Sequence, residues 1–175
     1  MEIDLQFEPL TAELYTTYIN IGTTAYNQHY RHLWPNGDTF TYIENSFTEK
    51  VLFQEEKDQN TSLFLIKSKH SYTGILKITF NKAFDNYSAF ESLYIDKIYV
   101  LKEYTGQGIG RKTIEFVINL AKKRMKKAVY LEAMKKGPAL PFYLANNFAI
   151  VGTTEVPFPN VINEEKPMFI LSREI

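Results

Sequence analysis

Three glycines in alternate positions form the part of this sequence whose chemistry is clearest. Gly106, Gly108 and Gly110 follow a strand-like run of β-branched and aromatic residues at positions 94–100 and precede an amphipathic, helix-like stretch at residues 109–123. The first four N–H groups of a helix have no partner inside the helix and lie at the positive end of its dipole, so they stabilise a nearby anion. Glycine lets an anion approach the backbone because it has no Cβ atom. The pattern therefore predicts a binding site for phosphate groups.

Two common phosphate-binding motifs do not fit this run. The P-loop requires Gly-Lys-Ser or Gly-Lys-Thr in direct succession, whereas Arg111 separates Gly110 from the Lys-Thr pair that follows. The dinucleotide fingerprint is Gly-x-Gly-x-x-Gly in the first βαβ unit of a parallel sheet, whereas this run is Gly-x-Gly-x-Gly and begins about a hundred residues into the chain. A glycine-rich turn without a ligand is the remaining structural alternative.

The six residues at positions 105–110, Thr-Gly-Gln-Gly-Ile-Gly, resemble the acyl-CoA signature of the GNAT superfamily of N-acetyltransferases. The preceding run at residues 94–100, Tyr-Ile-Asp-Lys-Ile-Tyr-Val, is similar in particular to a strand of the bacterial spermidine/spermine (polyamine or diamine) acetyltransferases. The resemblance covers most of the chain and is specific at residues 94–148. It implies the GNAT fold, acetyl-CoA as co-substrate without a metal, and transfer of the acetyl group to an amine.

The resemblance also implies which residues bind acetyl-CoA. Main-chain N–H groups around the glycines are expected to receive the pyrophosphate, two cationic side chains add positive charge, and the pantetheine arm pairs with the exposed edge of the preceding strand. A main-chain N–H near Val100 would then stabilise negative charge on the thioester oxygen. Family members have Gln or Arg at the position of Thr105, so only a main-chain role is carried over there. The expected acetyl-CoA-binding residues are Ile98, Tyr99, Val100, Thr105, Gly106, Gln107, Gly108, Ile109, Gly110, Arg111 and Lys112.

A tyrosine is expected to act as the general acid. Residues 139–143, Ala-Leu-Pro-Phe-Tyr, resemble the family's Ala-x-x-x-Tyr helix, and the resemblance implies that Tyr143 protonates the departing CoA thiolate. Proton transfer from a phenol with a pKa near 10 to a thiolate with a pKa near 8.5 is uphill by roughly 2 kcal/mol, which a catalysed reaction tolerates. The alternative is that Tyr143 only packs within a helix. The family's asparagine contact to pantetheine is not carried over, because Lys135, Lys136 and Gly137 stand in that place.

An acceptor amine needs a group that takes its proton. An alkylamine with a pKa near 10.4 is almost wholly protonated at pH 7, and only the neutral amine attacks a thioester. Asp96 lies four residues before Val100, where the polyamine enzymes have glutamate, and strict strand alternation would place Asp96, Ile98 and Val100 on one face. Aspartate is one methylene shorter, so we expect it to act through a water molecule. A surface carboxylate paired with a lysine is the alternative for Asp96, and Glu91 is a weaker candidate for the base.

Three other groups of residues have plainer interpretations. His29 and His32 have the spacing of a metal-binding pair, but no third ligand is evident, so an aromatic, partly buried loop is favoured. The basic run at residues 122–127 is interpreted as a solvated helix end rather than an RNA-binding surface. Four aromatic residues lie where family members bind the acceptor, and they either hold an ammonium group by cation–π attraction or pack in the core. These are Tyr26, Tyr30, Trp34 and Tyr42.

The composition fits a cytosolic enzyme. A chain of 175 residues with 45% hydrophobic content is enough for one domain with a filled core, and no linker, repeat or low-complexity segment divides residues 1–175. Lys and Arg number 20, as do Asp and Glu, so the overall charge indicates neither nucleic acid nor an anionic membrane as a partner. The lack of cysteine excludes disulfides and thiolate chemistry. The polar N-terminus and the absence of a long apolar run predict neither a secretion signal nor a membrane span.

The hydrophobic patterns predict an α+β fold. Its three layers (an α/β three-layer arrangement) are a mixed, mostly antiparallel sheet and helices on both faces of that sheet, in agreement with the GNAT fold. Strands are expected at residues 3–8, 61–67, 72–80, 93–100, 128–134, 148–154 and 168–171. A first helix is expected from about residue 9, and residues 26–37 are expected to form a loop. A second helix is expected from about residue 39, with a further helical turn that runs to residue 56. Two more helices are expected at residues 109–123 and 138–146.

These observations favour an N-acetyltransferase that moves an acetyl group directly to the primary amine of a small molecule, with polyamines as the first candidates. A homodimer is left open, and the expected location is the cytoplasm. One alternative is an enzyme that acts on a protein, a peptide or an aminoglycoside-like compound. Another is a non-catalytic acyl-CoA-binding regulatory module. A nucleic-acid-binding protein that uses the basic helix end is a third class.

Overall fold

The computed structural model describes residues 4–175 of the chain, and the part of the first predicted strand at residue 3 lies outside them. Within residues 4–175, seven strands form one mixed sheet in the order β1-β2-β3-β4-β5-β7-β6. Neighbouring strands are antiparallel except for β4 and β5, which are parallel. The strands are β1 (Leu5–Pro9), β2 (Thr61–Ser68), β3 (Ser71–Thr79), β4 (Ser92–Val100), β5 (Ala128–Met134), β6 (Ala149–Glu155) and β7 (Pro167–Glu174).

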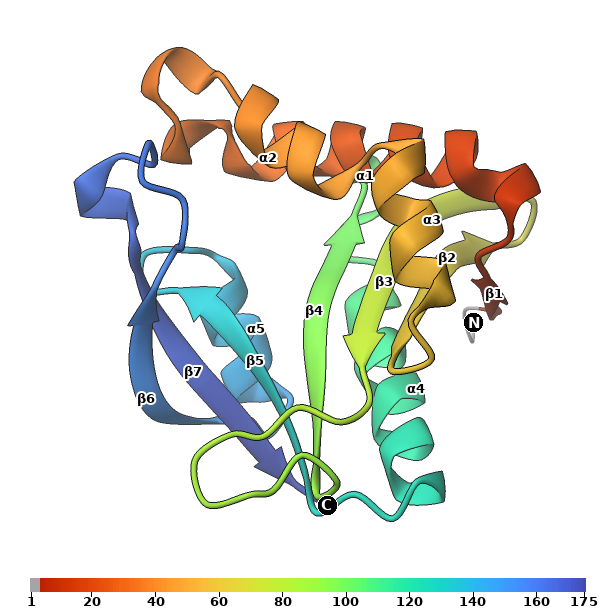
Figure 1. Cartoon of the computed structure of the whole chain (residues 1–175), viewed down its shortest axis with the longest axis vertical. Coiled ribbons are helices and arrows are strands. Elements are labelled where there is room, and N and C mark those ends of the chain that lie inside the picture. The colour runs from red at the N-terminus through yellow and green to blue at the C-terminus, as the bar shows by residue number, and fades with distance from the viewer. Residues whose placement is uncertain (1–3) are drawn as a thin grey trace.

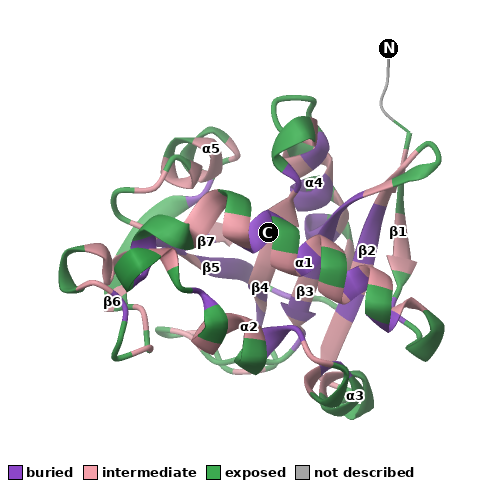
Figure 2. Cartoon of the chain, turned by 90° about the horizontal axis from the view of Figure 1, so that it is seen from above, coloured by how far each residue is buried: buried purple, intermediate pink, exposed green. Residues whose placement is uncertain are grey.

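Helices cover both faces of this sheet (Figure 1), which confirms the predicted three-layer arrangement. One face, here called the α4 face, is covered by α4 (Ile109–Lys123) and α5 (Ala139–Ala145). The opposite face, here called the α1 face, is covered by α1 (Tyr15–Tyr30), α2 (Phe40–Ser46) and α3 (Glu49–Lys57). Figure 2, seen from above, shows α4 and α5 on one side of the strands and α2 and α3 on the other, with α1 crossing over the strands.

Each face has its own hydrophobic core. On the α4 face the apolar stripe of α4 packs against side chains of β3, β4 and β5, and on the α1 face the aromatic side chains of α1 and of the segment after it pack against β2 and β3. Burial of such side chains is the main favourable term in folding. Fully or almost fully buried members are Leu76, Leu93, Ile114, Val117 and Val129 on the α4 face, and Tyr18, Leu33, Trp34, Phe47, Leu52, Leu65 and Ile75 on the α1 face.

Strands β4 and β5 are paired only at their first residues and then diverge (Figure 1). Beyond the last pair, the edge of β4 that faces β5 has no strand partner among residues 4–175. A parallel pair that separates in this way leaves main-chain groups of β4 available to a ligand. The paired residues are Ser92 with Ala128, Leu93 with Val129, and Tyr94 with Tyr130.

Strand β4 carries a bulge at Asp96. Lys97 pairs with Lys77 of β3, yet Ile95 pairs with Ile78, so Asp96 is an extra residue with no partner of its own on β3. One extra residue reverses the alternation of side chains along the rest of a strand. The bulge therefore changes which side chains of β4 share a face.

The bulge contradicts the prediction that Asp96 shares a face with Ile98 and Val100. The side chains of Ile98 and Val100 pack in the core of the α4 face, whereas Tyr99 packs in the core of the α1 face. Asp96 bonds to Thr79 on the α1 face. Strict alternation was the wrong assumption, because the pairing with β3 sets the register and the sequence of β4 does not reveal it.

Helix α1 is longer than predicted. A 3-10 turn at Ala12–Leu14 precedes it, and the helix continues to Tyr30 through part of the expected loop at residues 26–37. The helical backbone does not persist to Trp34, which is extended (φ −112°, ψ 141°), as is usual for a residue before proline. The β2–β3 hairpin, α4 and β5 lie where the sequence predicts them.

Candidate functional site

The glycine loop before α4 presents main-chain N–H groups without partners. Gly106 (φ 76°) and Gly108 (φ 84°) adopt the left-handed conformation that favours glycine. A Cβ atom at Gly106 would meet no other atom within 4 Å, so the backbone is open there. Among the hydrogen bonds of residues 4–175, none is donated by a main-chain N–H of residues 106–111. The loop therefore has the free donors that an anionic ligand requires.

Side chains of the loop hold it in shape. The hydroxyl of Thr105 donates to the carbonyl of Lys102 at 2.7 Å, and the amide of Gln107 donates to the carbonyl of Glu103 at 3.1 Å. Both side chains are thereby engaged within the loop, which leaves its main chain as the surface for a ligand. This agrees with the expectation that Thr105 contributes through its backbone.

The first turn of α4 combines a buried residue with basic ones. Ile109 is buried in the core of the α4 face, while the exposed Arg111 pairs with Glu115 at 3.2 Å. Arg111 and Lys112 place positive charge at the start of the helix, as the sequence predicts for the phosphate site. An exposed pair of this kind is weak, so Arg111 can exchange Glu115 for a ligand at little cost.

Glycine is also required where α5 meets α4. A Cβ atom at Gly110 would lie 2.9 Å from the ring of Phe142, closer than such atoms approach in proteins. The absence of a side chain lets α5 pack against the first turn of α4. This contact places α5 beside the glycine loop.

The open edge of β4 is formed by Ile98 and Val100. The N–H of Leu101 donates to the carbonyl of Thr73 of β3 at 2.9 Å, and because antiparallel residues alternate, the main-chain groups of Ile98 and Val100 point away from β3. The carbonyl oxygen of Tyr99 points toward β3 instead, since a Cβ atom at Gly74 would lie 2.4 Å from it. The structure thus places Ile98 and Val100 on the exposed edge and turns the main chain of Tyr99 away from it.

Sequence reasoning missed the contact between His29 and this edge. The Nε2 atom of His29 lies 2.9 Å from the carbonyl oxygen of Val100, to which its N–H donates. The outward carbonyl of Val100 is therefore engaged by α1, and its outward N–H is not. A histidine in an aromatic segment gave no signal for this role, because the contact joins residues far apart in the sequence.

Tyr143 lies on α5 with its ring against Phe142 and Phe148. Among residues 4–175 its hydroxyl makes no hydrogen bond. Burial raises its pKa above the ordinary value, and the nearby phenol of Tyr30 adds to this effect. The phenol is thus fully protonated at neutral pH and has a proton to donate. Its packing also agrees with the structural alternative, so both roles of the ring are compatible.

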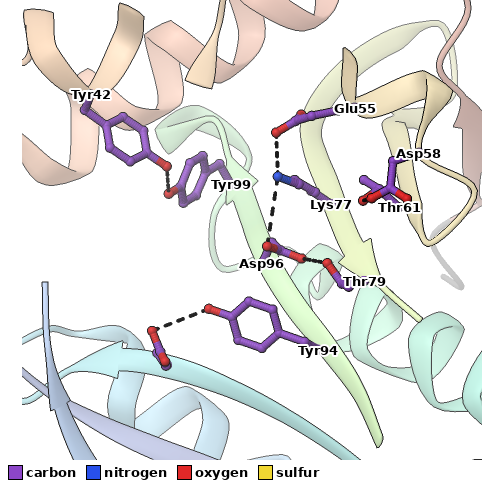
Figure 3. A network of polar contacts seen from close by, with 10 residues as sticks. Tyr42, Glu55, Asp58, Thr61, Lys77, Thr79, Tyr94, Asp96 and Tyr99 are labelled. Atoms are coloured by element: carbon purple, nitrogen blue, oxygen red, sulfur yellow. Dashed lines mark hydrogen bonds and ion pairs between the residues drawn. The ribbon is translucent and has the colours of Figure 1, made fainter. Parts of the chain in front are cut away.

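A polar network occupies the α1 face beside the bulge (Figure 3). Asp96 accepts a hydrogen bond from Thr79 at 2.7 Å and lies 4.0 Å from the ammonium of Lys77. Lys77 in turn pairs with Glu55 of α3 at 2.5 Å. Asp96 therefore does pair with a lysine, as its alternative interpretation held, but in a largely buried network rather than at the surface.

Burial raises the pKa of Asp96 above its ordinary value, although Lys77, Thr79 and neighbouring lysines act in the opposite direction. A carboxylate with a raised pKa is a stronger proton acceptor than an ordinary one. The side chain is 19% exposed, so a water molecule can reach it. These properties suit a general base that acts through water.

Lys97, the residue after the bulge, was not singled out by sequence reasoning. Its ammonium lies 5.8 Å from the ring centroid of Tyr42 and 5.3 Å from that of Phe47. Burial lowers its pKa to about 8, and the charge of Lys77 lowers it further, while Glu55 acts in the opposite direction. In a regular strand, the side chains of a lysine and the aspartate before it would point to opposite faces. The bulge, which the sequence does not reveal, turns both side chains toward the same face.

Tyr94 spans the two diverging strands. Its hydroxyl donates to Glu132 of β5 at 3.4 Å, just beyond the last paired residues (Figure 3). Burial raises the pKa of Tyr94 above its ordinary value, and Glu132 strengthens the effect. Glu132 therefore lies on the same side of the sheet as Asp96, at the point where the strands separate.

The aromatic residues of the predicted acceptor site form a packed cluster. The rings of Tyr26 and Tyr42 stack at 3.7 Å between centroids, and Tyr30 stacks on Tyr26 at 5.0 Å. Trp34 donates to the hydroxyl of Tyr26 at 2.9 Å. Core packing explains these rings, while Tyr42 also presents its face to the ammonium of Lys97 at the distance given above.

The remaining candidates have structural roles. Glu91 pairs with Lys127, which lowers its pKa to about 2 and makes it a poor base. The basic run is not a uniformly solvated helix end, because the buried Lys126 donates to Asn81 at 2.5 Å and to the carbonyl of Phe90 at 2.9 Å. Within residues 4–175, no group of three His, Cys, Asp or Glu side chains is placed to hold a metal ion. None of the helices described here has the length and apolar character needed to cross a membrane.

Comparison with known proteins shows what the chain is similar to. PaiA N-acetyltransferase from Thermoplasma acidophilum, in complex with coenzyme A, matches with a TM-score of 0.76 and 14% identity over 100% of both chains. A chimera of the spermidine N-acetyltransferase from Vibrio cholerae matches with a TM-score of 0.70 and 14% identity over 97% of this chain and 95% of that one. A GNAT family acetyltransferase from Elizabethkingia anophelis with acetyl-CoA bound matches with a TM-score of 0.61 and 19% identity over 98% of both.

The family model of the acetyltransferase (GNAT) family matches residues 23–148, which include the bulged strand, the glycine loop and α5. This match extends over well more than half of the chain. The chain therefore belongs to the GNAT family of acetyltransferases.

Proposed function

We propose that this enzyme transfers the acetyl group directly to the primary amine of a small molecule, with Asp96 as the base and Tyr143 as the acid. The observation that carries the proposal is the row of unpartnered N–H groups at residues 106–111 of the described chain, beside the open edge of β4. Together they offer a diphosphate and an extended amide chain the donors and acceptors that each requires.

The residues present fit acetyl-CoA. The N–H groups of residues 106–111 would hold its pyrophosphate, with positive charge from Arg111 and Lys112, and the outward main-chain groups of Ile98 would pair with its pantetheine arm. The open space at Gly106 leaves room for phosphate oxygens near the backbone. Acetyl-CoA supplies the activated acetyl group.

The outward N–H of Val100 is the proposed donor to the thioester oxygen. A fixed main-chain donor stabilises negative charge as it develops on that oxygen. Because His29 bonds to the carbonyl of the same residue, it holds this part of β4 in place. His29 is thus a positioning residue in the proposed mechanism.

Asp96 and Tyr143 belong to opposite faces of the sheet. Asp96 lies on the α1 face, and Tyr143 lies on the α5 helix of the α4 face. Direct transfer requires that the amine approach the carbonyl carbon while the sulfur departs and takes up a proton. A base on one face and an acid on the other serve these two events without competing for the same space.

The acceptor class has several candidates. The strand at residues 94–100 resembles that of the polyamine enzymes, which makes polyamines one candidate, and the similar chimera from Vibrio cholerae is a spermidine N-acetyltransferase. Carboxylates of Asp96, Glu55 and Glu132 on the α1 face favour an amine of some kind. A protein, peptide or aminoglycoside-like acceptor, and a non-catalytic acyl-CoA-binding module, remain the alternatives.

Calorimetric titration with coenzyme A, followed by assays of CoA release from acetyl-CoA, tests the proposal. The assays should include spermidine, an aminoglycoside, a peptide with a free amino terminus and simple primary amines. Binding of coenzyme A and acetylation of a small amine are expected. No heat at millimolar coenzyme A would refute the proposed donor site, and tight binding without transfer to any amine would favour the regulatory module.

A further inference from the structure

The bulge places two consecutive side chains of β4 on one face. Asp96 bonds to Thr79, and the ammonium of Lys97 lies over the rings of Tyr42 and Phe47, which belong to the α1 side of the sheet. In a regular strand, neighbouring side chains point to opposite faces. A carboxylate and an ammonium are thereby set side by side next to the open edge of β4.

Two carboxylates of this face, those of Glu55 and Asp96, pair with a different lysine. Lys77 lies 2.5 Å from Glu55 and 4.0 Å from Asp96. Lys97 takes no part in the hydrogen bonds and ion pairs among residues 4–175, and its ammonium contacts the faces of two aromatic rings. Within the described chain, Lys97 is a partly buried cation that makes no hydrogen bond or ion pair with a carboxylate, although the charges of Glu55 and Asp96 act on it at longer range.

A partly buried ammonium without a counter-ion is unfavourable in the free protein. Burial and the charge of Lys77 together outweigh Glu55 and Asp96, so the pKa of Lys97 is lowered to about 8. At neutral pH the group is still mostly protonated. An anion that arrives with the substrate would be stabilised by it.

We propose that Lys97 binds a carboxylate carried by the acceptor, so that the preferred acceptor is a short aminocarboxylate rather than a polyamine. This inference rests on the proposed function of the same site. The amine of such a molecule would meet Asp96 while its carboxylate meets Lys97. Asp96 and Lys97 are consecutive residues whose side chains lie on one face, so the two ends of one small molecule can meet them.

The same geometry disfavours a diamine. A second ammonium would lie against Lys97, and like charges in a partly buried site repel. An unpaired cation at this position thus discriminates between acceptors that share an amine and differ only at the far end.

Three acceptors with the same four-carbon chain test the inference: γ-aminobutyrate, putrescine and butylamine. The measurement is kcat and KM from CoA release, for wild type and for Lys97→Met, Lys97→Arg and Lys67→Met. Wild type should prefer γ-aminobutyrate to putrescine by about tenfold or more in kcat/KM. Lys97→Met should abolish this preference by raising the KM for γ-aminobutyrate, whereas Lys97→Arg should retain it.

Lys67→Met is the matched control, because Lys67 also places its ammonium over a tyrosine ring, 5.5 Å from the centroid of Tyr72. It should behave as wild type. Coenzyme A affinity and thermal unfolding of each variant show whether it is folded. The role of Lys97 would be overturned, and the proposed function would stand, in either of two cases. Wild type would use putrescine as well as or better than γ-aminobutyrate, or a folded Lys97→Met variant would keep the preference for γ-aminobutyrate. Acetylation of no amine at all would overturn the proposed function as well.

Discussion

Replacing Tyr143 by phenylalanine removes one hydroxyl and keeps the ring. The ring contacts with Phe142 and Phe148 remain, and no hydrogen bond among residues 4–175 is lost. The free energy of unfolding should therefore change by no more than about 0.5 kcal/mol. A fall in kcat of the Tyr143→Phe variant would then result from the loss of the hydroxyl in the reaction and not from unfolding of the protein.

The size of that effect follows from the proton transfer. General acids contribute typically about 10²–10⁴-fold. Burial raises the pKa of Tyr143, and a buried thiolate has a raised pKa for the same reason, so their difference stays near the roughly 2 kcal/mol of the free groups. Because a thiolate also leaves without full protonation, we expect the lower end, a fall in kcat of about 10²-fold, or about 2.7 kcal/mol.

The assay is steady-state CoA release with the best acceptor, combined with calorimetry for coenzyme A. The Kd for coenzyme A should stay within about twofold, because the phenol is not among the groups proposed to bind it. Tyr87→Phe is the control, since it removes a phenol that donates to Glu174 at 3.2 Å outside the proposed site. A kcat for Tyr143→Phe within about threefold of both wild type and control would refute a general-acid role.

Three further predictions concern the base, the glycine loop and the buried lysine. Asp96→Asn should lower kcat/KM by about 10²-fold at pH 7. Because burial raises the pKa of Asp96, the kcat/KM of wild type should fall on the acidic side at a pH above the ordinary pKa range of aspartate, and this fall should be absent in the variant. Gly110→Ala should lower the free energy of unfolding by about 1–3 kcal/mol, because the new Cβ atom clashes with Phe142. At Gly106 a Cβ atom would meet no other atom, so Gly106→Ala should lower it by only about 1 kcal/mol and should mainly weaken coenzyme A binding. For the buried lysine, the quantity to follow is the free energy of unfolding of wild type minus that of Lys97→Met. This difference should rise by up to about 3 kcal/mol between pH 8 and 10.5, because Lys97 loses its proton at a lower pH in the folded protein than in the unfolded one. Urea titrations across that pH range measure it, and a flat difference would contradict the prediction.

Local patterns in the sequence predict the elements of the proposed donor side well. The glycine loop, α4 and β5 depend on glycine positions and on apolar spacing within one short stretch, and their bounds agree with the structure. The open edge of β4 depends on the family resemblance rather than on spacing. The structure supports it through the three residue pairs that join β4 to β5.

The acceptor side could not be predicted in the same way. The bulge at Asp96 arises from the register with β3, and the partners Lys77 and Glu55 come from distant parts of the chain. Periodicity within β4 carries no information on either. The contact of His29 with Val100 has the same cause, since it joins residues that are 71 positions apart.

The separation of the two faces has a consequence for how such an enzyme diversifies. The groups proposed to hold the donor come from one continuous stretch that ends with α5. The helices that cover the face proposed for the acceptor, α1, α2 and α3, come from the first third of the chain. Apart from His29, which holds Val100, mutations in these early helices can alter substrate choice while the groups proposed to bind acetyl-CoA stay intact. Selection can therefore act on the two halves of the reaction almost independently.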